Sequence, residues 1–88
     1  MNSLVKARVR RSIVLLQKLE ERTGMKMAME CREYKEIMSK EQASKAMQLR
    51  ALQALKECLD ELNPKTEDEV HEISLLREDL QHIIVGVR

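Results

Sequence analysis

Hydrophobic side chains recur every three or four residues along most of the chain, a spacing typical of amphipathic helices. In the first segment four residues follow this rhythm: Val5, Val9, Ile13 and Leu16. The pattern stops at Gly24, a residue type that often follows the last turn of a helix. We therefore expect a first helix over residues 3–23.

The middle of the chain contains one expected break. Residues 25–62 contain no glycine and no proline, so the sequence leaves open whether they form one helix or two. The segment Ser39-Lys40-Glu41-Gln42 has the form of a capping box, and the apolar stripe loses its register there. We expect helices over 25–38 and 40–62. A second stripe then contains Met47, Ala51, Leu55, Cys58 and Leu62, with Leu52 and Leu59 on its flank.

The last segment has the clearest boundaries. Pro64 cannot continue a helix, because it lacks the backbone donor. Thr66-Glu67-Asp68-Glu69 then forms a capping box with three acids in the first turn, which predicts a helix over 66–85. Its apolar residues follow a coiled-coil rhythm: Ile73, Leu76, Leu80, Ile83 and Val87. We expect Gly86 to fray its end.

These elements predict an all-α fold in which residues 1–88 form a single domain. Short connections between helices favour antiparallel neighbours, and thus a small antiparallel bundle or helical hairpin of three to four helices. The two glycines and one proline are too few for the turns of an all-β fold. The stripes offer more apolar surface than an 88-residue monomer needs, so we expect oligomerisation to complete the bundle.

Charge is distributed unevenly, although the net charge is only +1. Residues 1–26 carry seven lysine or arginine side chains and two glutamates. Residues 60–88 carry eight acidic and three basic side chains. We expect the basic first helix to lie near the acidic last helix, within the chain or across a dimer.

No catalytic constellation is visible, so we expect no enzyme. The chain lacks a glycine-rich phosphate loop, the motifs H-E-x-x-H and G-x-S-x-G, and any cysteine cluster. Met25, Met27, Met29 and Cys31 are soft ligands, but alternate residues of a helix do not face one another. We interpret this segment as core and interface, with an adaptable partner surface and a metal site as alternatives.

The two histidines, His71 and His82, share a helix face with Glu67 and Glu78. The spacing is Glu-x-x-x-His, whereas carboxylate metal bundles use Glu-x-x-His. We therefore expect exposed side-chain pairs there, with no metal and no cofactor.

Contact with another protein is the function that these features favour. The chain is expected to be an adaptor, a small chaperone or an inhibitor that binds a second copy or a heterologous partner through apolar helix faces. The expected partner or oligomer interface is formed by Val9, Ile13, Leu16, Leu52, Leu55, Leu59, Ile73, Leu76, Leu80 and Ile83.

The alternative function is a dimeric nucleic-acid-binding protein with a basic N-terminal helix. The residues that would contact phosphate are Lys6, Arg8, Arg11, Lys18 and Arg22. The absence of phenylalanine and tryptophan speaks against stacking on bases.

A cytoplasmic location is expected. Two cysteines outside any C-x-x-C pair fit a reducing compartment. The longest apolar run, residues 13–16, is too short to span a membrane. The basic N-terminus is also compatible with a mitochondrial transit peptide.

Overall fold

The chain folds into four α-helices. A computed structural model describes residues 3–23, 28–40 and 42–88, and their side chains except those of residues 23 and 28–30. The helices are α1 (Ser3–Thr23), α2 (Ala28–Ser39), α3 (Lys45–Asp60) and α4 (Glu67–Val87). The described residues contain no strand. The expected all-α class is confirmed, and oligomerisation stays a prediction.

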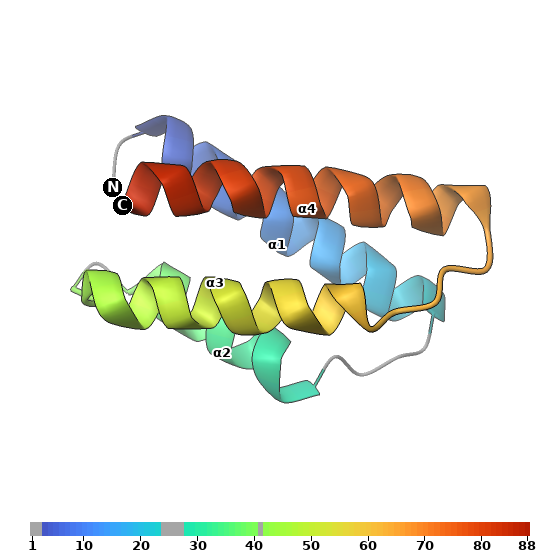
Figure 1. Cartoon of the computed structure of the whole chain (residues 1–88), viewed down its shortest axis with the longest axis horizontal. Helices are drawn as coiled ribbons and strands as arrows, with labels where there is room; N and C mark the ends of the chain where they lie inside the picture. Colours follow the sequence, from blue (N-terminus) through green and yellow to red (C-terminus); the bar gives the residue numbers. More distant parts are fainter. Residues whose placement is uncertain (1–2, 24–27, 41) are drawn as a thin grey trace.

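The four helices form an antiparallel bundle about 36 × 23 × 18 Å in extent (Figure 1). Helix α1 packs along α4, α4 packs on α3, and α3 packs on α2. Contact between α1 and α2 is the sparsest of the four sides. Both chain ends lie at the same end of the bundle (Figure 1). The basic first helix thus lies beside the acidic last helix within a single chain.

The buried side of α1 differs from the expected stripe. Its buried residues are Val5, Val9, Ser12, Leu16 and Leu19. Ser12 is fully buried, whereas Ile13 is only half-buried. The spacing is four, three, four, three, which is the seam of a coiled-coil-like contact. Ser12 therefore occupies the seam position that the hydrophobic pattern had assigned to its neighbour Ile13.

The expected break in the middle of the chain exists, but the expected capping residue is wrong. Helix α2 ends at Ser39, whose hydroxyl donates to the carbonyl oxygen of Lys35 at 2.5 Å. Ser44 caps α3 instead, and its hydroxyl accepts a hydrogen bond from the backbone nitrogen of Met47 at 3.2 Å. Residues 40–62 are therefore not all helical, and α3 occupies only Lys45–Asp60.

The start of α4 confirms Thr66 as the N-cap, whereas Glu69 reaches back to the backbone nitrogen of Lys65 and not to that of Thr66. The Thr66 hydroxyl accepts a hydrogen bond from the Glu69 backbone nitrogen at 3.2 Å. The Glu69 carboxylate accepts one in return from the Lys65 backbone nitrogen at 2.8 Å. Three acids lie in the first turn, where their negative charges interact favourably with the positive end of the helix dipole.

The sequence predicted that Gly86 frays the end of α4. This prediction is wrong, because the helix continues to Val87. A Cβ atom at Gly86 would lie 2.5 Å from Cγ2 of Val5. The glycine therefore permits a close approach between the end of α4 and the start of α1.

A single hydrophobic core fills the bundle and receives residues from all four helices. Seven leucines are buried almost completely: Leu16, Leu19, Leu52, Leu55, Leu59, Leu76 and Leu80. Among the described residues, no helix is long and apolar enough to cross a membrane.

Candidate functional site

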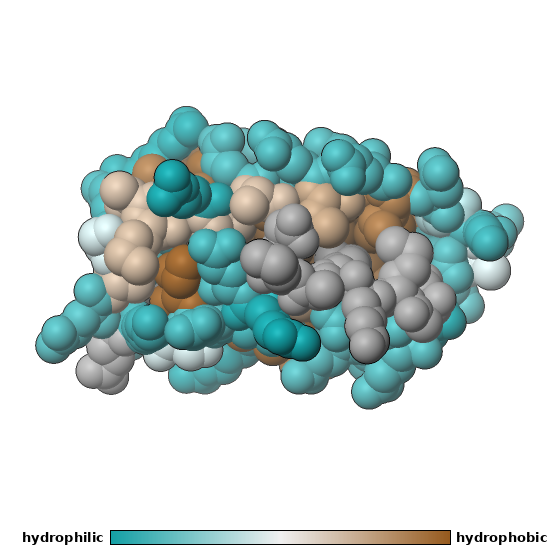
Figure 2. All heavy atoms as spheres, turned by 90° about the horizontal axis from the view of Figure 1, so that it is seen from below, coloured by the Kyte–Doolittle hydropathy of each residue, from teal (hydrophilic) through white to brown (hydrophobic). Residues whose placement is uncertain are grey.

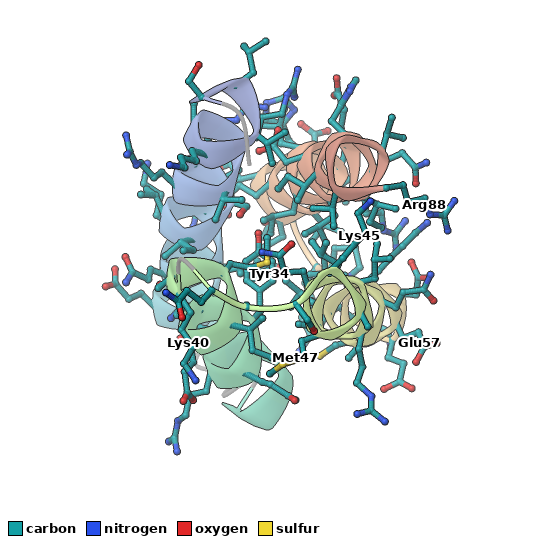
Figure 3. The ribbon with its side chains drawn as sticks, turned by 90° about the vertical axis from the view of Figure 1, so that its left-hand side faces the viewer. Tyr34, Lys40, Lys45, Met47, Glu57 and Arg88 are labelled. Carbon is teal, nitrogen blue, oxygen red and sulfur yellow. The ribbon has the colours of Figure 1, made fainter. Side chains whose placement is uncertain are left out.

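A buried hydrogen-bonded pair links α1 to α2. The hydroxyls of Ser12 and Tyr34 lie 2.6 Å apart, and both residues are fully buried. The Ser12 hydroxyl donates its proton to the carbonyl oxygen of Val9 at 2.6 Å. The Tyr34 hydroxyl must then be the donor to Ser12. Figure 3 shows Tyr34 near the middle of the bundle. Burial raises the pKa of Tyr34 to about 12.

A buried carboxylate links α4 to α1. Asp79 is fully buried and accepts hydrogen bonds from two arginines of α1. The distance is 3.3 Å from Nη1 of Arg8 to Oδ1 and 2.8 Å from Nε of Arg11 to Oδ2, and Nη2 of Arg11 also binds Oδ1. The hydrogen bond to Asp79 and its charge raise the pKa of Arg11. The arginine side chains remain 36% and 54% exposed, so they cover the carboxylate at the surface.

A second ion-pair cluster lies along the same α1–α4 contact. Arg22 lies 3.1 Å from Glu72 and 3.9 Å from Asp68 of α4. Three of the five residues expected to contact phosphate, Arg8, Arg11 and Arg22, thus bind carboxylates of the chain itself. The other two, Lys6 and Lys18, are exposed. The nucleic-acid alternative stays a prediction.

The residues expected to form a partner interface lie mostly in the core of the single chain. Nine of the ten are buried: Val9, Leu16, Leu52, Leu55, Leu59, Ile73, Leu76, Leu80 and Ile83. The tenth, Ile13, is half-buried. Most of these side chains hold the helices of the chain together and would reach a partner only if the helices separated. Val9 and Ile13 differ from the others, because they also line a surface hollow. The role of these residues in an interface stays a prediction.

A different surface feature lies on the sparsely packed side of the bundle. A hollow of about 430 Å³ opens between α1, the end of α2 and the start of α3. We call it the basic groove, and it is lined by Lys6, Val9, Arg10, Ile13, Met38, Ser39, Lys40 and Gln48. Figure 3 looks onto this end of the bundle, with Lys40 at the end of α2.

The groove has an apolar floor and a basic rim. Val9 and Met38 are 5% and 7% exposed, and Ile13 is half-buried. The side chains of Lys6, Arg10 and Lys40 are exposed around them. Helical residues four apart are neighbours, so Lys6 and Arg10 lie one turn apart on one face of α1.

The lining of the basic groove contains cations but no acid, unlike that of two other hollows on the described surface. One of the others, between α3 and the end of α4, contains Glu57 with Arg50 and Arg88. The other, at the start of α4, contains Glu67 with Lys65. Both are more open to solvent than the basic groove. Lys40 lies 3.5 Å from Glu36 across one turn of α2, an exposed pair that contributes little.

Apolar side chains also reach the surface along α3 and just before it. Met47 is 45% exposed, and Ala43, Ala54 and Cys58 are half-buried. Figure 2 shows a band of hydrophobic atoms among hydrophilic ones on this side of the molecule. Three of these four residues have small side chains, and none of the four lines the basic groove.

The described residues contain no group of three or more side chains able to hold a metal ion. His71 and His82 are both exposed, as are Glu67 and Glu78. Burial raises the pKa of the Cys31 thiol to about 12, so this thiol is protonated and a poor ligand at neutral pH.

The expectations for Gly24, Met25 and Met27 lie outside the described residues, as does that for the side chain of Met29. Sequence reasoning missed Ser12, Tyr34 and Asp79 as an internal polar layer. Two features of the sequence could have indicated this layer: Ser12 at a position of the apolar seam, and Arg8 and Arg11 three residues apart on one helix face.

Comparisons with protein-family models, with curated proteins and with solved structures found no significant match.

Proposed function

We propose that this chain is a non-enzymatic helical protein-protein interaction module that acts as an adaptor, small chaperone or inhibitor. The observation that carries the proposal is the basic groove, whose apolar floor and charged rim lie on the sparsely packed side of the bundle. A groove between helices with apolar anchoring positions is a common way to bind a helix of another protein.

The internal polar contacts support a binding role over a catalytic one. Ser12, Tyr34 and Asp79 are hydrogen-bonded within the chain, and each is fully buried. A buried polar network whose hydrogen bonds are all made rigidifies the core, and a rigid core can support a binding surface. The lining of the groove contains lysine, arginine, serine and glutamine but no acid or histidine. Glu36, which pairs with Lys40, is exposed and lies outside that lining.

The proposed location is the cytoplasm. Cys31 and Cys58 form no disulfide bond in the part of the chain that the structure describes, which fits a reducing compartment.

Site-specific photocrosslinking in cells tests the interaction. A photoreactive amino acid replaces Ile13 in the groove or, as the matched control, its neighbour Val14. Val14 is 48% exposed and does not line the groove. We expect a discrete crosslinked product from position 13 and none from position 14. The product contains either a second copy or another protein. Equal crosslinking at both positions, or none at either, would count against the proposal.

A further inference from the structure

Helix α1 has basic side chains on two flanks, and the bundle covers only one of them. On the first flank, Arg8, Arg11 and Arg22 bind carboxylates of the acidic helix α4. On the second flank, Lys6 and Arg10 line the basic groove. No ion pair joins either of these two side chains to an acid among the residues that the structure describes.

The flank of α1 that faces α4 shows that this helix packs against an acidic helix. Val5, Val9 and Leu16 pack in the core while neighbouring arginines bind the acids of α4. The second flank repeats this arrangement on a smaller scale. Ile13 is half-buried between the core and the surface, and Lys6 and Arg10 lie beside it around the hollow.

The size of the groove limits what enters it. A hollow of about 430 Å³ is too small for a whole helix, so only side chains of one helix face can occupy it. Aliphatic side chains would cover Val9, Ile13 and Met38, which have an apolar surface. Carboxylates beside them would reach the rim of Lys6, Arg10 and Lys40.

We propose that the basic groove binds an acidic amphipathic helix of a partner protein. This inference rests on the proposed function and specifies its partner class. The partner helix places its apolar stripe in the hollow and its glutamates or aspartates against Lys6, Arg10 and Lys40. Charge complementarity sets the orientation of the helix and speeds its association.

The probe is a fluorescent alanine-based helical peptide with a leucine stripe flanked by glutamates. Its matched control has glutamine in place of each glutamate. Binding is measured by fluorescence anisotropy on the full chain at low and high salt. We expect the glutamate peptide to bind, to weaken as salt rises, and to bind more tightly than the glutamine peptide.

Two protein variants locate the site. Lys6→Glu combined with Arg10→Glu reverses two charges on the groove. Lys18→Glu combined with Arg32→Glu reverses the same number on exposed side chains outside the groove. We expect the first variant to lose about tenfold or more in affinity and the second to lose far less. All four positions are exposed, and circular dichroism checks that both variants keep their helices.

Three outcomes would overturn the inference. The first is that the glutamine peptide binds as tightly as the glutamate peptide, and the second is that both variants weaken binding equally. The third is that the glutamate peptide does not bind, while a single-stranded oligonucleotide binds through Lys6 and Arg10. If the peptide fails but position 13 still crosslinks to a protein, only the acidic-helix inference fails. If position 13 does not crosslink either, the proposed function fails with it.

Discussion

Replacing Ser12 with alanine should destabilise the bundle more than replacing Tyr34 with phenylalanine, although the second change removes the same hydrogen bond. The Ser12 hydroxyl gives its only proton to the carbonyl oxygen of Val9, so Tyr34 is the donor in the pair. Alanine at position 12 leaves a fully buried O–H group without an acceptor. Phenylalanine at position 34 removes that donor altogether.

The magnitudes follow from this asymmetry. An unsatisfied buried donor costs about 1–3 kcal/mol, and alanine returns roughly 0.5 kcal/mol through its higher helix propensity. We therefore expect Ser12→Ala to lower the free energy of unfolding by about 1.5 kcal/mol. Tyr34→Phe should cost about 1 kcal/mol, the value of an ordinary hydrogen bond.

The double variant gives the sharpest test. With both hydroxyls gone, no buried donor lacks an acceptor, so we expect Ser12→Ala with Tyr34→Phe to be about as stable as the Tyr34→Phe variant or more stable. The two changes are then strongly non-additive, as expected for residues in direct contact.

Urea unfolding followed by far-ultraviolet circular dichroism measures all four proteins. In thermal unfolding, the Ser12→Ala variant should melt roughly 6–12 °C below the parent, because 1 kcal/mol corresponds to about 4–8 °C in a domain of this size. A double variant that loses the sum of the two single effects would refute the assignment of Tyr34 as the donor, and so would a Tyr34→Phe variant less stable than Ser12→Ala.

Three other predictions concern the same bundle. Tyr34 is the one tyrosine of the chain, and burial raises its pKa in the folded protein to about 12. The absorbance of tyrosinate should therefore appear only well above pH 10 in the folded protein, whereas in urea it should appear near pH 10. The stabilisation from a neutral Tyr34 is complete below pH 10 and is lost as the pH rises towards 12, so the difference in stability between the parent and Tyr34→Phe should change only in that window. Gly86→Ala should destabilise the protein by about 1–3 kcal/mol through overlap with Val5, and in a Val5→Ala background it should be neutral or stabilising in the same urea assay. Asp79→Ala should cost about 2 kcal/mol at neutral pH by removing charge-assisted hydrogen bonds to α1, and an unchanged urea midpoint would contradict that estimate.

The boundaries of the helices were largely predictable because their signals are local. Pro64 ends the preceding segment, and Thr66 with Glu69 starts α4 through contacts within one turn. The break between α2 and α3 was also expected. The predicted capping residue was wrong because Ser39 and Ser44 both have side chains suited to an N-cap, and the structure uses Ser44.

The sequence by itself determined the all-α class, the approximate extents of the helices and the opposite charge of the first and last helices. Only the tertiary structure decided that α1 turns Ser12 rather than Ile13 into the core, and that Asp79 is buried. Hydropathy places polar residues outside, since an unpaired polar group is costly to bury. Tyr34, Arg8 and Arg11 remove that cost, and they are brought to Ser12 and Asp79 from distant parts of the chain. The basic groove has the same origin: Lys6, Arg10 and Lys40 come together because α1 and α2 meet over only a short stretch.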